Sequence, residues 1–344
     1  MGVQISEILL KKEISVDELS GKTIAIDAFN HLYQFLTTIR QRDGTPLMDS
    51  KGNVTSHLSG LFSRTTNLME KGINLIYVFD GKSPKLKLEE QERRAMVKRD
   101  AESKYKIAAE KEDIEEMKKY AGRTSRLSGE MIIEAKQLLD ALGIPVVEAP
   151  SEGEAQAAYI VKNGDAYAVS SQDSDSLIFG SPYLIRNLSI SGRRKRTNKL
   201  AYETINPEII ELEPNLKNLG INRDQLIVLG ILVGTDYNKS GIKGIGPKNA
   251  LKLLKKHGND FDSLFKEVEW GEYYNIDWKE IYNLFTNMPL REKYTLEWKQ
   301  PDPEKIKRIL VEKHDFSQER IDSAMEKLEY AREKGRQKGL GEFF

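Results

Sequence analysis

Short apolar runs alternate with amphipathic stretches through the first half of the chain. The strand-like runs are Thr23 to Ile26, Asn74 to Phe79, Pro145 to Val147 and Ala166 to Val169. The helical stretches are 57–71, Ser128 to Leu142 and Gln156 to Val161. Ser128 is a typical N-cap residue and Gly143 a typical helix stop. Strands that alternate with helices predict an α/β fold with a doubly wound, mostly parallel sheet.

Three later segments depart from this alternation. Residues 81–126 contain 14 Lys/Arg and 10 Asp/Glu but few large apolar side chains, so we expect an exposed helical excursion. The basic run within Ser191 to Lys199 predicts the tip of a hairpin. After Asp236 the pattern is mainly helical, and we expect a flexible glycine-rich tail from Gly335 to Phe344.

Composition narrows the function classes. The 344 residues include 53 Lys+Arg and 53 Asp+Glu, so the formal net charge is 0 and any binding to a polyanion depends on local patches. The absence of cysteine excludes disulfides, zinc–thiolate sites and cysteine nucleophiles. No apolar run approaches the roughly 20 residues that a membrane span needs, and no signal-peptide pattern opens the chain. We therefore expect a cytoplasmic protein with no membrane association.

Acidic side chains follow the predicted strands. Asp27 and Asp80 come directly after two of them, and two acidic pairs, Glu152/Glu154 and Asp173/Asp175, follow the others. Because parallel strands end at one edge of a sheet, where ligands bind, we expect these carboxylates to converge.

Such convergence requires positive charge. Two carboxylates about 4 Å apart repel by about 4 kcal/mol at an effective dielectric of 20. Oxygen ligands without cysteine suit Mg²⁺ or Mn²⁺ rather than zinc. A cluster of this kind is typical of two-metal phosphodiester hydrolysis.

Each acid also has an ordinary structural interpretation. Ser151 to Glu154 matches a capping box, and Asp173 could cap the helix that begins near Ser176. Asp27 and Asp80 could be solvated turn residues. Four strand ends that all lead into acids nevertheless favour the metal site.

Two further segments suggest binding to nucleic acid. Gly244 and Gly246, with Pro247 after them, predict a helix-hairpin-helix whose backbone N–H groups grip a duplex backbone, although an ordinary helix–helix loop would use the same residues. Directly after Asp80 comes a basic stretch that could steer phosphates or form a solvated helix face. It contains Lys82, Lys85, Lys87, Arg93, Arg94, Lys98 and Arg99.

The final residues combine Leu340 with Phe343 and Phe344. One helical turn would place these side chains on a single face that plugs an apolar pocket of a partner. The alternative is a tail that docks on its own core.

Several motifs together resemble the flap endonucleases of the XPG-type 5′ nuclease family. They are FDGKSPKLK, PSEGEAQAAY, SSQDSD, LVGTDY, GIKGIGPKNA and the terminal QKGLGEFF. The resemblance implies a PIN-like α/β fold with a nuclease N region (1–98), a basic helical arch (81–126) and an I region (116–258). It also implies a helix-hairpin-helix at 234–256, a helical region at 259–334 and a clamp-binding tail at 335–344. The lack of a basic extension beyond Phe344, the lack of cysteine and the high charge content point to an archaeal member.

The resemblance also assigns roles to individual residues. It implies that one metal ion is bound by Asp27, Asp80, Glu152 and Glu154, and a second by Asp173, Asp175 and Asp236. It adds Lys87 and Arg94 as catalytic contacts to the scissile phosphate, beside Asp27, Asp80 and Asp173. The DNA contacts that it implies are Tyr33, Arg40, Arg64, Glu152, Gly234, Asp236, Gly244 and Gly246. The clamp contacts that it implies are Gln337, Leu340, Phe343 and Phe344.

The implied activity is Mg²⁺-dependent cutting of 5′ flaps near the junction with duplex, with 5′–3′ exonuclease activity, in Okazaki fragment maturation and base excision repair. Two Mg²⁺ ions are expected in the site, with Mn²⁺ as a substitute, and K⁺ at the helix-hairpin-helix. The expected partners are flap-structured DNA and the sliding clamp (PCNA), and the protein is expected to be monomeric without the clamp and associated with the nucleoid. The alternatives are a related 5′ exonuclease or junction resolvase, and a non-catalytic DNA-binding scaffold tethered to the clamp.

Overall fold

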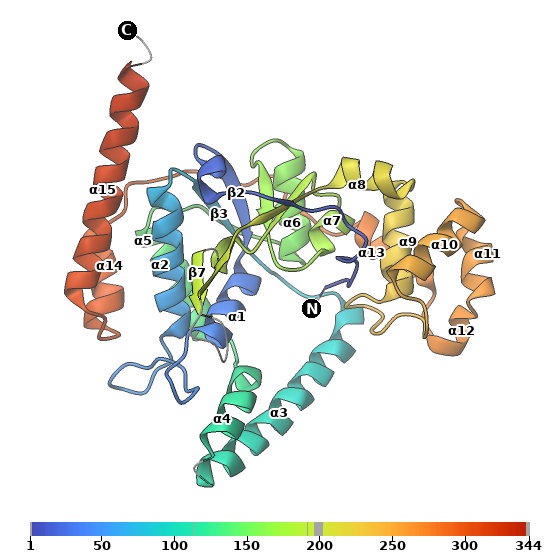
Figure 1. The fold of residues 1–344 in the computed structure, drawn as a ribbon, viewed down its shortest axis with the longest axis horizontal. Coiled ribbons are helices and arrows are strands. Elements are labelled where there is room, and N and C mark those ends of the chain that lie inside the picture. The colour runs from blue at the N-terminus through green and yellow to red at the C-terminus, as the bar shows by residue number, and fades with distance from the viewer. Residues whose placement is uncertain (1, 112, 191, 196–201, 342–344) are drawn as a thin grey trace.

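The computed structural model describes residues 2–111, 113–190, 192–195 and 202–341 (Figure 1). Within these residues a seven-stranded sheet has the order β1-β9-β6-β5-β2-β3-β4. Its strands are β1 (Lys12–Glu13), β2 (Thr23–Asp27), β3 (Asn74–Phe79), β4 (Val146–Glu148), β5 (Ala168–Ser170), β6 (Tyr183–Arg186) and β9 (Glu208–Glu211). Strands β2 to β6 pair in parallel, whereas β9 is antiparallel to both β6 and β1. The predicted mostly parallel α/β sheet is confirmed, with antiparallel strands added at one edge.

The sheet is covered on both faces because its central strands alternate their apolar side chains. Ala25 of β2 packs in a core cluster with α6 (Gly153–Lys162), α7 (Asp175–Ile178) and α9 (Arg223–Val233). Its neighbours Ile24 and Ile26 point to the opposite cluster. That second cluster includes residues of α1 (Ala28–Thr38), α2 (Ser56–Glu70) and α5 (Gly129–Ala141). Two covered faces explain why these strands are short apolar runs.

The strand register aligns the ends of the central strands. Asp27 pairs with Val78, which places Asp80 just beyond the same edge. Ser170, the last residue of β5, pairs with Ile26 beside Asp27. The sheet therefore delivers the segments that carry the acidic residues to one common edge.

The crossover between β3 and β4 contains a projecting pair of helices, which we term the arch (Figure 1). It consists of the 3₁₀ turns η2 (Lys85–Lys87) and η3 (Gly122–Thr124) and the helices α3 (Leu88–Glu110) and α4 (Ile114–Ala121). Many of its described side chains are exposed, while Glu90, Ala101 and Ala108 are buried. The arch thus has the exposed character expected of residues 81–126.

The second half of the chain is mainly helical, as predicted. Before α9 lie the 3₁₀ turn η4 (Leu188–Ile190), the antiparallel ribbon β7 (Gly192–Lys195) and β8 (Tyr202–Ile205), and α8 (Leu212–Leu219). The expected basic hairpin tip at 196–201 lies outside the described residues. After α9 follow α10 (Pro247–His257), α11 (Phe261–Glu267), α12 (Trp270–Tyr273), α13 (Trp278–Thr286), α14 (Pro303–Lys307), the π-turn η5 (Arg308–Glu312) and α15 (Gln318–Gly341). The remaining 3₁₀ turn, η1, covers Val16–Leu19.

The tail differs from the prediction. Residues from Gly335 were expected to be flexible, but the backbone of α15 remains helical to Gly341. A glycine inside a helix costs about 1 kcal/mol, which weakens a long helix rather than ending it. Gln337 and Leu340 lie in this helical stretch, whereas Phe343 and Phe344 lie outside the described residues. None of the helices in the described part of the chain is long and apolar enough to cross a membrane.

Candidate active site

Hydrogen bonds join carboxylates from three strand ends. Asp27 ends β2 and caps α1 by accepting the N–H of Asn30 at 3.0 Å. The Ser171 hydroxyl, just after β5, lies 3.1 Å from Asp27 Oδ2 and 3.0 Å from Glu154 Oε1. Asp80, just after β3, accepts the N–H of Gly153 at 2.6 Å. Asp80 is thereby tied to the start of α6, which carries Glu154, and Ser171 joins Glu154 to Asp27.

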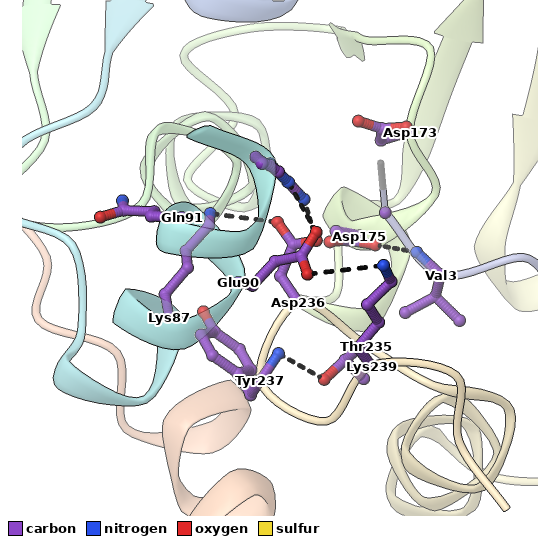
Figure 2. A network of polar contacts seen from close by, with 12 residues as sticks. Val3, Lys87, Glu90, Gln91, Asp173, Asp175, Thr235, Asp236, Tyr237 and Lys239 are labelled. Atoms are coloured by element: carbon purple, nitrogen blue, oxygen red, sulfur yellow. Dashed lines mark hydrogen bonds and ion pairs between the residues drawn. The ribbon is translucent and has the colours of Figure 1, made fainter. Parts of the chain in front are cut away.

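The remaining acids come from α7, from the loop before it and from the loop after α9. Asp175 begins α7 and accepts the N–H of Val3 at 2.6 Å, so the N-terminal segment lies against the cluster (Figure 2). Asp173 Oδ2 lies 3.4 Å from the side-chain amide of Asn30. Asp236 follows α9 on the loop that leads to α10.

The structure decides between the interpretations of these acids. The capping box at Ser151 is absent, because Glu152 is the N-cap of α6 and its side chain makes no capping hydrogen bond. Asp173 does not cap α7 either, since Ser174 occupies that position. Asp27 does cap its helix, yet it remains bonded to Ser171 beside the other acids. Helix capping therefore explains only part of the role of Asp27, and it does not explain the positions of Glu152 and Asp173.

Crowding strongly perturbs these carboxyl groups. Burial raises the pKa of Asp27 to about 7, and the charge of Asp80 adds to the effect. Burial and the neighbouring Glu152 raise the pKa of Asp80 to about 6. Burial together with Asp173 raises the pKa of Asp175 to about 7. The pKa of Glu154 is also raised, first by burial and then by Asp175. The cluster therefore resists full ionisation unless positive charge is supplied.

The base of the arch supplies some of this charge. Lys87 Nζ lies 2.6 Å from Glu152 Oε2. It also lies 3.4 Å from Asp236 Oδ2 (Figure 2). Burial alone would lower the pKa of Lys87, but Glu152 and Asp236 outweigh it and raise this pKa. Arg94 Nη2 donates to Asp236 Oδ1 at 2.5 Å. Both predicted phosphate-binding cations therefore lie on the carboxylate cluster.

The donor set suits a hard divalent cation. The acids offer oxygen ligands, and Glu152 Oε1 is buried without a hydrogen-bond partner in the described structure. Within the described residues, however, no three His, Asp or Glu side chains form a ready-made metal cage. Ion pairs with Lys87 and Arg94 hold Glu152 and Asp236 in their present positions. A bound ion would therefore require these side chains to reorient.

The expected DNA contacts have different surroundings. Tyr33 on α1 is half-buried, with Lys98 Nζ 4.8 Å from its ring centroid. Arg40 donates to the carbonyl oxygens of Thr37 and Gly44 and to the Ser125 hydroxyl, so it ties α1 to the end of the arch. Arg64 lies on α2. DNA contact by these three residues stays a prediction.

The glycine hairpin adopts the predicted turn. Gly234 has φ of 113° and Gly244 has φ of 81°, which are values that a residue with a Cβ rarely adopts. Gly246 is the N-cap of α10, and Pro247 stands in its first turn. Helices α9 and α10 flank this turn, and both the assignment as a helix-hairpin-helix and its duplex binding stay predictions.

Sequence reasoning missed three residues of the site. Ser171 and Asn30 lie beside predicted acids, and each bonds to carboxylates from other segments. Glu90 is buried at the base of the arch and bonds to Arg93 and Arg94. Ser171 lies within the SSQDSD motif and could have been suspected, whereas Glu90 is one of many acids in a charged segment.

Comparisons with known proteins agree over the length of the chain. The model of the XPG N-terminal domain matches residues 1–101, and that of the XPG I-region matches residues 143–236. Flap endonuclease 1 of Hyperthermus butylicus is 55% identical, with 99% of this chain and 98% of the relative covered. Flap endonuclease 1 of Aeropyrum pernix is 52% identical, with 100% of both chains covered. Both organisms are archaea, the group expected from the sequence.

Solved structures agree with this assignment. Flap endonuclease-1 from Methanococcus jannaschii superposes with a TM-score of 0.75 at 44% identity, with 96% of this chain and 98% of that one covered. The catalytic core of Rad2 in complex with DNA substrate has a TM-score of 0.68 at 22% identity and covers 94% of this chain and 97% of its own, which shows a shared fold. Full-length identity above 50% and both domain matches carry the conclusion. The chain belongs to the flap endonuclease 1 family of XPG-type nucleases.

Proposed function

We propose that this protein is a Mg²⁺-dependent, structure-specific 5′ flap endonuclease with 5′–3′ exonuclease activity. The observation that carries the proposal is the meeting of buried carboxylates at one sheet edge with Lys87 and Arg94. Acidic side chains that can hold divalent cations, beside basic side chains that can hold a substrate anion, suit phosphoryl chemistry, of which phosphodiester hydrolysis is one case. Family membership supplies the substrate class, which is DNA with a 5′ flap.

Each acid has a proposed role. Asp27, Asp80, Glu152 and Glu154 would hold one Mg²⁺, and Asp173, Asp175 and Asp236 the other. The two ions would supply the positive charge that activates water and neutralises the leaving oxygen, and Mn²⁺ could replace them. Ser171 and Asn30 would orient Asp27, Glu154 and Asp173 through the hydrogen bonds already described.

The basic residues then act on the substrate. When a phosphate enters, Lys87 and Arg94 would exchange their carboxylate partners for its oxygens, which keeps each cation paired throughout. Tyr33 would stack on a base beside the cut; it lies on α1, the helix that Asp27 caps, and its side chain is half-buried. Arg40 and Arg64 would contact the DNA backbone, and Arg40 would do so from its bonded position near the arch.

The outlying elements would select the junction. The helix-hairpin-helix would bind duplex DNA through backbone groups around Gly234, Gly244 and Gly246, and K⁺ would bind at the same element. The arch would receive the 5′ single strand. Residues 335–344, including Gln337, Leu340, Phe343 and Phe344, would bind the sliding clamp during Okazaki fragment maturation and base excision repair. The regions 1–98, 116–258 and 259–334 remain our proposed division of the chain.

Substitution of Asp173 tests the hydrolytic proposal. Asp173→Ala should retain flap binding, because the proposed DNA contacts are made by other residues, while cleavage in Mg²⁺ falls by orders of magnitude. The measurements are fluorescence anisotropy for binding and single-turnover cleavage of a labelled double-flap substrate. Near-normal cutting would remove Asp173 from the mechanism. Preferential cleavage of a nicked duplex or a four-way junction by the unaltered protein would instead support an exonuclease or a resolvase.

A further inference from the structure

A buried acid lies among the cations at the base of the arch. Glu90 on α3 is 7% exposed, although it sits where a negatively charged substrate would approach. An isolated carboxylate there would repel phosphate and be costly to bury. Arg93, Arg94 and Lys239 surround this carboxylate, and their positive charges offset the cost of burying it.

Glu90 accepts hydrogen bonds from two consecutive arginines, Arg93 and Arg94. Arg93 donates to it through both Nε and Nη2 at 2.7 Å, which is a bidentate pair. Arg94 Nε donates to Glu90 Oε1 at 2.8 Å. The hydrogen bonds from Arg93 and then from Arg94 hold the pKa of Glu90 low, at about 2. Glu90 is therefore ionised, and a neutral side chain in its place would bind the two arginines less strongly.

The grip on Arg94 is directional. A guanidinium group is a rigid plane, so fixing Nε fixes the direction of both terminal nitrogens. With Nε held by Glu90, Nη2 is aimed at Asp236 Oδ1, 2.5 Å away. Arg94 is thereby oriented toward the carboxylate cluster before any substrate arrives, which lowers the reorganisation that phosphate binding would need.

Glu90 also connects two separate elements. Figure 2 shows Lys239 reaching Glu90 from the loop after α9, and its Nζ lies 3.9 Å from Glu90 Oε2. Asp236 on the same loop binds Arg94. The base of the arch and the start of the helix-hairpin-helix are thus joined at this carboxylate. The position of the Glu90 carboxylate therefore fixes the orientation of the Arg94 guanidinium relative to the elements proposed to bind the duplex.

We infer that Glu90 is a positioning residue, which acts by orienting the Arg94 guanidinium toward the scissile phosphate. This inference rests on the proposed function, because Arg94 is the group that would touch substrate. The competing explanation is that Glu90 merely stabilises α3 through its i,i+3 and i,i+4 pairs with Arg93 and Arg94. Such helix pairs act on stability and not on one catalytic group.

A double-mutant cycle separates these explanations. Glu90→Gln keeps the shape of the side chain but removes its charge, and charge-assisted hydrogen bonds are about twice as strong as neutral ones. We expect Glu90→Gln to lower single-turnover cleavage of a double-flap substrate by about tenfold, whereas loss of a transition-state donor in Arg94→Ala costs about 100-fold. In the Arg94→Ala background, Glu90→Gln should change the rate by less than about twofold, because nothing remains to be positioned.

Controls keep the result interpretable. Glu92→Gln removes the same charge from an exposed position on the same helix and should leave the rate unchanged. Calorimetric unfolding of each variant tests folding, and anisotropy in Ca²⁺ tests flap binding, which we expect Glu90→Gln to change little. The inference is overturned if Glu90→Gln cuts at the normal rate, or if its tenfold loss persists in the Arg94→Ala background. Absence of flap cleavage by the unaltered protein would instead refute the proposed function.

Discussion

Magnesium should stabilise this protein much more at pH 8 than at pH 5.5. The folded, metal-free chain holds Asp27 and Asp175 with pKa values of about 7 and Asp80 with a pKa of about 6, all above the ordinary value of 3.8. Between about pH 4 and 7 the folded state therefore binds more protons than the unfolded state. By linkage, its stability falls as the pH rises through this window and is lowest, for this cluster, above pH 7.

The expected size follows from these shifts. Each proton difference changes stability by about 1.36 kcal/mol per pH unit. One to two protons over the interval from pH 7 to 5.5 correspond to about 2 to 4 kcal/mol in favour of the lower pH. Mg²⁺ at about 100 times its dissociation constant adds about 2.7 kcal/mol when the oxygens are ionised. Protons and Mg²⁺ compete for the same carboxylate oxygens. Protonation therefore stabilises the fold at low pH, and Mg²⁺ stabilises it at high pH, where the oxygens are ionised.

Differential scanning calorimetry would measure this competition. Metal-free protein should unfold several degrees higher at pH 5.5 than at pH 8, and 10 mM MgCl₂ should raise the unfolding temperature at pH 8 but scarcely at pH 5.5. NaCl of equal ionic strength is the control for screening, and the Asp27→Asn, Asp175→Asn double variant should lose most of both responses. An equal Mg²⁺ effect at the two pH values would refute the argument that these carboxyls are protonated in the metal-free fold.

Three other predictions concern the edges of the site. Gly2→Ala should lower single-turnover cleavage at least tenfold with an unchanged circular dichroism spectrum, because the added Cβ would clash with the Asp175 carboxylate; an unchanged rate would contradict this. Without DNA, trypsin should cut within 81–126 before it cuts the core, as mass spectrometry of the first fragments would show; equal resistance would mean that the arch is packed. Deleting 337–344 should abolish clamp binding in titration calorimetry while flap cleavage without the clamp stays the same, and retained affinity would place the clamp contact elsewhere.

The strand ends could be predicted because local sequence determines them. β2 and β3 are apolar on both faces, and Asp27 and Asp80 follow from where these runs stop. Asp236 follows a helix rather than a strand, so only the resemblance to known nucleases pointed to it. The antiparallel edge made by β9 and β1 was missed, because the two residues of β1 carry no periodic signal.

Features that depend on long-range contacts could not be predicted. Glu90 is one of ten acids between residues 81 and 126, and its burial results from Arg93, Arg94 and Lys239, which come together only in the folded chain. The helical backbone to Gly341 is not predicted from the sequence, because glycines such as those in the tail usually indicate the end of a helix. α15 has 24 residues, and adding a residue to an existing helix costs less than starting one, so the helix continues through these glycines.

The arch occupies the interval between two neighbouring parallel strands. Tyr77 of β3 pairs with Val146 of β4, and every residue of the arch lies between them in the chain. Parallel strands need a connection that leaves the sheet and returns, so the length of that connection is not set by strand pairing. Insertions or deletions there can change the length of the arch while the acidic edge keeps its register. In this topology, a change in the arch therefore leaves the strands that position Asp27 and Asp80 unaltered.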